Sequence, residues 1–545
     1  MSISRREFIS RSALLAPLGT LPPWFAQSLL AQTTEPLIRH DVNSSDPEAQ
    51  KAVEMYRTGV TAMKLKPAHD PTSWQFQANI HGYGRKEFEE VFPTDSGDKL
   101  LAQKVWGTCP HNFDGGDPTT SFLPWHRMYL HFFERIVRAA AQEPSSSRLG
   151  IPYWNWTKDH TLPDAFRENV NGSQDDNALY WGVRRRSVTA LSNPLSIASI
   201  ERGLELVEVT GLLDEPGFDA DLEPTTLRGL NSGLEDGPHG FIHMLVGAQE
   251  SDGSWRGMGV FEEAARDPVF WSHHCNIDRL WSHWRQNKDH KEPVDAEIQL
   301  TENERVAWSD VRHTFVDESG REIALTNRQV LVAAEILERG YVYDDLPREA
   351  VVAIDTSLQS ISPMSSNTSP KAHPIQKLAT AGPVEVAGKR TDVTLEPVAA
   401  FLAPEPVTEQ TLIIQEIAAS PGIKDSLFDV YVNLPANEQP TPDSPYYVGG
   451  LNIFNALAAS RPMLPPGSTK AGGALKHDKH GGAEQRLPIA DALRRQGWKQ
   501  GDPIKVTIVP IPLDNQMAAP STSVEPPPAI RAPTLSIGGF ELIGR

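Results

Sequence analysis

The stretch Asp267-Pro-Val-Phe-Trp-Ser-His-His-Cys-Asn-Ile-Asp278 places two adjacent histidines on a segment that we predict to be helical. It follows Pro238-His-Gly-Phe-Ile-His243, which supplies two more histidines. A second set of histidines, His81, His111 and His126, lies upstream. Two groups of three imidazoles, in a chain with almost no thiolate, predict a paired metal site. The metal that they indicate is copper.

The pair His239 and His243 has a spacing that recurs in metal sites. Residues four apart on a helix project from the same face, one turn from each other. Taken alone, such a pair is also typical of an ordinary surface or core. The zinc-peptidase alternative requires His-Glu-x-x-His, whereas the second position here is Gly240. No general base stands there, so this class of enzyme is excluded.

Either His273 or His274 can complete the downstream group, and the sequence geometry favours His274. His274 and Asp278 lie four residues apart on one predicted helix, so we expect the carboxylate to orient that imidazole. His126 opens another predicted helix. His131, five residues further on, projects from a different flank, which favours a packing role.

The choice of ligands points to copper rather than to zinc or iron. Neutral imidazole suits copper, and three ligands per metal leave an open face where O2 can bind. Zinc and di-iron sites normally recruit carboxylates or thiolates at comparable positions, and none recurs at these spacings. We therefore expect two copper ions as cofactors and O2 as co-substrate.

The bulk composition is that of a globular protein with more than one domain. The 545 residues exceed what a single hydrophobic core usually supports. A formal net charge of -19 argues against nucleic acid or an anionic membrane as a partner. Beyond the N-terminus, no apolar run reaches the roughly 18 residues of a membrane span. Cys109 and Cys275 are the two cysteines, which excludes a disulfide framework but leaves a single disulfide possible.

The N-terminus has the pattern of a bacterial Tat export signal. Arg5 and Arg6 precede Phe8 and Ile9, and an apolar stretch follows from residue 12 to residue 30. We expect residues 1–31 to be a signal peptide and the mature protein to be periplasmic or secreted.

Helical periodicity marks the part of the chain that carries the histidines. We predict helices over residues 48–66, 122–142, 239–246 and 268–287. We expect residues 32–354 to form a mainly α domain with a four-helix-bundle core and long loops, which would hold the expected pair of copper ions. Its trailing segment begins at about residue 295.

The composition changes after about residue 350. Residues 355–404 are rich in Ser, Pro, Thr and Ala and predict a linker. Alternating, β-branched runs follow at residues 411–417, 427–433, 504–510 and 534–543. We therefore expect residues 405–545 to form a C-terminal β-sandwich domain.

The motifs resemble those of a known family. The runs Phe122-Leu-Pro-Trp-His-Arg-Met-Tyr-Leu-His-Phe-Phe-Glu134 and Asp267-Pro-Val-Phe-Trp-Ser-His-His-Cys-Asn-Ile-Asp-Arg-Leu-Trp281 are similar to the copper A and copper B signatures of type 3 copper proteins. They resemble in particular the plant-like polyphenol oxidases, which comprise catechol oxidases and tyrosinases. The resemblance extends to Gly340-Tyr-Val-Tyr343 and to Leu427-Phe-Asp-Val-Tyr-Val-Asn433 in the β-rich part.

The resemblance implies a set of copper ligands. His81, His111 and His126 match the copper A ligands, and His239, His243 and His274 match the copper B ligands. The spacing of Cys109 and His111 is similar to that of a Cys–His thioether in fungal relatives, with an unreacted buried thiol as the alternative. Cys275 has no such role in the family and is expected to be a small core residue.

Three further positions match the residues that shape the family's active site. Phe261 matches a bulky gate over copper A, and Glu235 matches a carboxylate that holds a water near the site. Gly240 stands where an Asn in strong monophenolases helps that water to deprotonate a phenol, so this device is incomplete here.

The resemblance implies oxidation of o-diphenols to o-quinones with reduction of O2 to water. The alternatives are a tyrosinase that hydroxylates monophenols, an o-aminophenol oxidase, and a haemocyanin-like O2 carrier. The expected partner is a small phenol, and the C-terminal domain is expected to cover the site as an intramolecular inhibitor.

Overall fold

The computed structural model describes residues 36–94, 97–110, 121–159, 161–167, 177–184, 234–250, 254–284, 297–301, 304–307, 311–327, 329–330, 340–346, 376–398, 410–420, 423, 427–441, 444–459, 483–511 and 534–544. The expected signal peptide, His111 and residues 355–375 of the expected linker lie outside these ranges.

The histidine-bearing part of the chain is helical, and the four predicted helices are present. They are α3 (Pro47–Lys64), α7 (Phe122–Ala140), α11 (Gly240–Val246) and α12 (Pro268–Trp284). Three shorter helices that the periodicity did not predict are α4 (Trp74–His81), α5 (Arg85–Val91) and α6 (Gly97–Val105). Short turns of 3-10 or π-helix are η1 (Asp164–Phe166), η4 (Glu235–His239), η5 (Gly257–Gly259) and η6 (Ala264–Arg266).

Side-chain caps begin two of these helices. The Asp46 carboxylate accepts a hydrogen bond from the Glu48 N–H (2.8 Å), and Pro47 follows it at the first helical position of α3. The Ser73 hydroxyl accepts from the Phe76 N–H (3.1 Å) at the start of α4. This second cap matters for function because α4 ends at His81.

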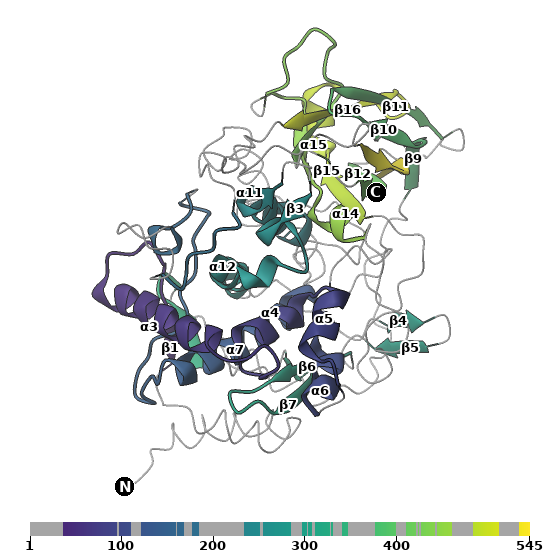
Figure 1. The fold of residues 1–545 in the computed structure, drawn as a ribbon. Coiled ribbons are helices and arrows are strands. Elements are labelled where there is room, and N and C mark those ends of the chain that lie inside the picture. Colours follow the sequence, from purple (N-terminus) through teal and green to yellow (C-terminus); the bar gives the residue numbers. More distant parts are fainter. Residues whose placement is uncertain are drawn as a thin grey trace, which may run out of the picture.

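Helix α7 packs against both α3 and α12 in the helical part (Figure 1). Its side chains from Phe122 to Glu134 are all buried, so neighbours cover it on every side. The Phe133 ring stacks on Trp271 of α12, with centroids 3.4 Å apart and planes at 9°. This stack fixes the two long helices side by side, and one predicted copper ligand opens α7 while another lies on α12.

A buried ionic network also ties α7 to α12. Arg39 lies in β1 (Leu37–Arg39) and pairs with Glu134 of α7 (3.0 Å) and with Asp278 of α12 (3.2 Å). Arg127 of α7 donates to the second oxygen of Asp278 (2.5 Å). Opposite charges of this kind stay ionised in a core only when they are paired, and these pairs are formed across three elements.

Strands from the trailing segment complete the helical part. Strand β1 pairs in parallel with β8 (Tyr341–Tyr343), whose two tyrosine hydroxyls donate to Asp278. The hairpins β6 (Arg312–Val316) with β7 (Glu322–Thr326) and β4 (Glu297–Thr301) with β5 (Glu304–Ala307) lie in the same segment. A small ladder of β2 (Ala248–Gln249) and β3 (Trp255–Arg256) follows α11.

The C-terminal part is a β domain, as the alternating runs predict. The described residues form one antiparallel sheet in the order β10-β17-β12-β18-β9-β11-β16-β13-β14, with β15 paired to β12. Two short helices, α14 (Phe454–Ala459) and α15 (Ala490–Arg495), belong to it. Its strands are β9 (Gln376–Ala381), β10 (Val384–Val386), β11 (Thr391–Pro397), β12 (Gln410–Ala419), β13 (Leu427–Val432), β14 (Tyr447–Asn452), β15 (Ala483–Pro488), β16 (Ile504–Ile511), β17 (Leu535–Ile537) and β18 (Gly539–Gly544).

The predicted boundary of this domain is wrong. Residues 376–397, assigned to the linker, form β9, β10 and β11 inside the sheet. Strand β9 pairs with β18 at the end of the chain, so the domain closes on itself through its first and last strands. The Ala- and Thr-rich composition concealed these strands because their apolar residues are small and few.

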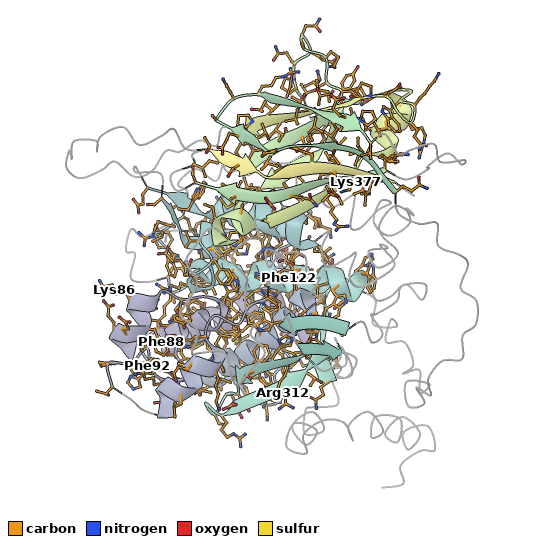
Figure 2. All side chains as sticks on the ribbon, turned by 90° about the vertical axis from the view of Figure 1, so that its right-hand side faces the viewer. Lys86, Phe88, Phe92, Phe122, Arg312 and Lys377 are labelled. Carbon is orange, nitrogen blue, oxygen red and sulfur yellow. The ribbon has the colours of Figure 1, made fainter. Side chains whose placement is uncertain are left out.

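The β domain rests on the helical part at α11 and β3, with α14 at the junction (Figure 1). Figure 2 labels Phe122, which is buried in the helical part, and Lys377 in the β domain. Among the described residues, no helix is long and apolar enough to cross a membrane. Cys109 and Cys275 are both buried and not joined by a disulfide.

Candidate metal centre

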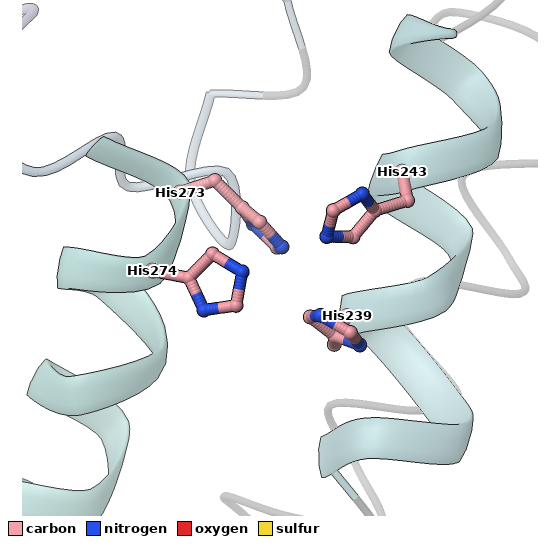
Figure 3. A group of neighbouring side chains, drawn as sticks. All are labelled: His239, His243, His273 and His274. Atoms are coloured by element: carbon pink, nitrogen blue, oxygen red, sulfur yellow. The ribbon is translucent and has the colours of Figure 1, made fainter. Parts of the chain in front are cut away.

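Two groups of potential metal ligands lie inside the helical part. One comprises His81 and His126 with Cys109, and the other comprises His239, His243, His273 and His274. Within each group the possible ligand atoms all lie within 4.8 Å of one another, and every member is buried. In the second group, two rings come from α12 and face two rings from the η4–α11 segment (Figure 3).

Four of the histidines are held by the same kind of contact. In each, Nδ1 lies within hydrogen-bond distance of a backbone carbonyl oxygen, which can only accept, so Nδ1 carries the proton. The lone pair is then on Nε2, the tautomer that a metal ligand needs. The four pairs are His81 with Phe261 (3.0 Å), His126 with Phe122 (2.7 Å), His239 with Glu235 (3.3 Å) and His243 with Met258 (2.8 Å).

The second group fits a soft or borderline metal ion. Nε2 of His243 and both ring nitrogens of His273 and His274 are buried and have no hydrogen-bond partner among the described residues. Buried polar atoms are normally satisfied, so nitrogens that converge in this way indicate a bound cation. No carboxylate belongs to either group, which favours copper over the metals that prefer oxygen.

The two groups meet at His126 and His274. Their rings stack with centroids 4.2 Å apart and planes at 6°, and His274 lies 6.5 Å from His81. His273 instead lies against His239 (5.5 Å) and Trp156 (5.8 Å). His274 is therefore the α12 histidine that stands between the groups.

The expected partnership between His274 and Asp278 is not observed. The carboxylate of Asp278 accepts from Arg39, Arg127 and the tyrosine hydroxyls of β8 instead. Paired cations hold the pKa of Asp278 below its usual value, although burial opposes this. Asp278 thus anchors the helix that carries His274 and does not touch the ring.

Cys109 borders the first group. Its Sγ lies 3.4 Å from Nε2 of His126. His111, the predicted third ligand, lies outside the described residues, so the Cys109–His111 thioether stays a prediction. Burial raises the pKa of the Cys275 thiol, which agrees with a small core residue there.

The three predicted shaping residues lie beside the histidines. The half-buried ring of Phe261 stands 4.5 Å from the His81 ring. Glu235 is fully buried, and its carbonyl oxygen accepts from His239. Gly240 opens α11 directly after His239 and is buried as well.

The β domain contributes an aromatic ring that the sequence analysis missed. Phe454 of α14 stacks on His243, with centroids 4.1 Å apart and planes at 21°, and lies 5.9 Å from His239. Phe454 is itself buried. No motif around Phe454 distinguishes it from a core residue of the β domain, so only the assembled structure reveals the contact.

Burial keeps these imidazoles neutral. It lowers the pKa of His243 to about 3 and lowers the pKa values of His126, His273 and His274 well below the usual range. For the last three, the charge of neighbouring histidines acts in the same direction. Neutral imidazole is the form that binds a metal.

These shifts predict an acid-labile apoprotein. An unfolded histidine titrates near pH 6.5, whereas the folded rings stay neutral to a much lower pH. The unfolded chain therefore binds more protons below about pH 6.5, and stability falls by up to about 1.4 kcal/mol per pH unit for each such histidine. Denaturant unfolding of the copper-free protein at several pH values between 7.5 and 5 measures this loss of stability. A midpoint that stays constant over that range would contradict the prediction.

The comparisons with known proteins agree with the motifs. A family model described as the common central domain of tyrosinase matches residues 71–201 and 208–287. A tyrosinase of Hahella sp. (strain CCB-MM4) is 26% identical over 487 residues, which covers 84% of this chain and 92% of that protein. A chloroplastic polyphenol oxidase of Malus domestica is 24% identical and covers 84% of this chain and 72% of its own.

The central part of the chain therefore matches the common central domain of tyrosinase, and the chain is similar to tyrosinases and polyphenol oxidases over most of its length. Its relatives are named as tyrosinases and polyphenol oxidases, which are copper oxidoreductases, and both histidine groups lie within the matched segments. The family implies a dinuclear copper centre, and the observed groups could hold such ions.

Solved structures share the whole fold. The latent apple tyrosinase is 20% identical, with a TM-score of 0.55, and the match covers 94% of this chain and 98% of that one. A latent aurone synthase is 21% identical, with a TM-score of 0.53 and coverage of 94% and 90%. A helical core followed by a C-terminal β domain is therefore the fold of this chain.

Proposed function

We propose that the protein oxidises o-diphenols to o-quinones and reduces O2 to water. Two catechols lose four electrons and four protons, which convert one O2 into two waters. The observation that carries the proposal is the meeting of two buried histidine groups at the stacked pair His126 and His274. A substrate bound there would contact both metal ions.

We assign His81, His111 and His126 to one copper ion and His239, His243 and His274 to the other. When bound, the copper pair supplies the two-electron transfer between the diphenol and O2. The chain supplies the rest: backbone carbonyls hold Nδ1–H of four rings and aim their Nε2 atoms inward. Burial of these rings keeps water and protons from competing for the ligand nitrogens.

Phe261 and Gly240 favour a diphenolase over a monophenolase. The Phe261 ring narrows the approach to His81, which lies 4.5 Å away. The monophenol reaction needs a base that removes the phenol proton, and Gly240 offers no side chain to position a water between Glu235 and the substrate. Tyrosinase activity and o-aminophenol oxidation are the alternatives. An O2 carrier disagrees with the enzymes that this chain is similar to.

A substrate comparison tests this proposal. We expect the copper-loaded protein to turn over a simple catechol at least about 10-fold faster than tyrosine, since missing proton abstraction typically costs 10²–10⁴-fold. Quinone formation followed by absorbance gives both rates, with the copper-free protein as the control. Tyrosine turnover at a comparable rate and without a lag would identify a tyrosinase instead.

We also propose that the β domain holds the enzyme in a latent state. The supporting observation is Phe454, whose ring stacks on His243 and approaches His239. A planar aromatic ring at this position occupies space that a phenol would need in order to reach the second histidine group. Export through the Tat signal at Arg5 and Arg6 remains part of the proposal.

A further inference from the structure

One short loop contacts a histidine in each group. The gate loop, Gly257–Phe261, lies between β3 and η6. Its Met258 carbonyl accepts from His243 (2.8 Å), and its Phe261 carbonyl accepts from His81 (3.0 Å). The same five residues therefore set the orientation of one ring on each side of the site.

Glu263 closes this loop. Both of its carboxylate oxygens lie 3.0 Å from Nε of Arg256, the residue that precedes the gate loop. One of them also accepts from the Gly257 N–H (2.8 Å). The Glu263 side chain thus joins the two ends of the loop. Its carboxylate forms a charge-assisted pair with Arg256 and accepts a backbone hydrogen bond from Gly257.

Close backbone packing holds the middle of the loop against α11. A Cβ placed on Gly247, just after α11, would stand 2.4 Å from the backbone nitrogen of Gly259. This approach brings the Met258 carbonyl within reach of His243. Gly257 itself has φ +61°, a conformation that glycine adopts without strain.

We propose that Glu263 is a positioning residue that holds the gate loop in the shape required by both copper sites. Without its carboxylate, the Gly257 N–H loses this acceptor, and Glu250 (3.3 Å) is the carboxylate that Arg256 keeps among the residues that the structure describes. The loop then relaxes, and the carbonyls that fix the His81 and His243 tautomers move with it. The inference rests on the proposed function of these two histidines as copper ligands.

The test compares Glu263→Ala, Glu263→Gln and the matched control Glu250→Gln. Glu250 pairs with the same Arg256 but makes no bond to the gate loop N–H. The readouts are bound copper per chain, the fraction of Cu(II) visible by electron paramagnetic resonance, and kcat and KM for a catechol. Two Cu(II) ions that are correctly coupled give no electron paramagnetic resonance signal. A visible signal therefore reports misplaced ligands independently of any activity assay.

For Glu263→Ala we expect a larger visible Cu(II) fraction and a loss of about 10- to 100-fold in copper affinity or kcat/KM, the usual effect of removing an outer contact to a ligand. Glu263→Gln retains an acceptor for the Gly257 N–H and should recover part of the loss, while Glu250→Gln should match the wild type. If Glu263→Ala does not fold, Glu263→Gln alone tests the inference. We then expect a smaller increase in the visible Cu(II) fraction and a smaller loss of copper affinity or kcat/KM.

The inference would be overturned if the copper affinity, the visible Cu(II) fraction and kcat/KM of the folded Glu263 variants lay within about twofold of those of Glu250→Gln. Removing a contact that orients a metal ligand lowers metal affinity or activity by more than that. Failure of the proposed function is distinguishable from this result. In that case the wild-type protein itself would bind no coupled copper pair or would leave every catechol unoxidised.

Discussion

The substitution His274→Ala will leave the protein with one bound copper ion and no measurable diphenol oxidation. His274 stands between the two histidine groups and stacks on His126. In the proposed assignment its loss removes a copper ligand at the point where the groups meet. We expect copper content to fall from about two ions per chain to about one, because three imidazoles are the usual set for each ion. Elemental analysis of the loaded protein and a catechol assay measure both effects.

The neighbouring substitution His273→Ala is the matched control. His273 is equally buried and belongs to the same ligand group, but its ring lies against His239 and Trp156, away from His81. We expect it to retain both copper ions and to lose at most the roughly 10- to 100-fold that an outer contact contributes. The reverse result, with copper lost from His273→Ala only, would show that the wrong histidine of the pair has been assigned.

The sequence predicted the long elements because their patterns are local. Helices α3, α7 and α12 each run for at least four turns, and the spacing of His239 and His243 follows directly from the helical period. Helix α4 escaped prediction because it is short and its residues Trp74-Gln-Phe-Gln-Ala-Asn-Ile-His81 alternate between apolar and polar, which is not the period of a helix. His81 was placed by resemblance to the family and not by periodicity.

Contacts between distant parts of the chain could not be read from the sequence. Asp278 was matched with His274 because they are four residues apart, whereas Arg39, 239 residues away, is one of its partners. The short strands β9 to β11 look like a linker until the last strand of the chain pairs with β9. Phe454 carries no sequence signal because its role depends on where the two domains meet. The carbonyls of the gate loop carry none because every residue has a backbone carbonyl, and only the fold decides which ones face His81 and His243.

Cleavage between the two domains will raise diphenol oxidation by the copper-loaded protein. In the sequence, residue 370 follows β8, which Asp278 holds to the helical part, and precedes β9, where the β domain begins, so we choose it as the cleavage point. A protease site introduced there separates the domains after folding and copper loading. We expect at least about a 10-fold gain in kcat/KM. If the β domain covers the site in most molecules, the apparent affinity for substrate is lowered in proportion to the small fraction of molecules whose site is open.

The substitution Phe454→Ala should reproduce part of this gain in the uncut chain. An aromatic stack contributes about 0.5–1.5 kcal/mol, so its removal should increase kcat/KM roughly 2- to 12-fold if the ring competes with substrate. Phe454→Leu should give a smaller gain. The control Trp498→Ala removes an aromatic ring whose N–H donates to the Asp502 carbonyl within the β domain, and it should leave the rate unchanged. Equal activity before and after complete cleavage would mean that the β domain stabilises the fold without covering the site.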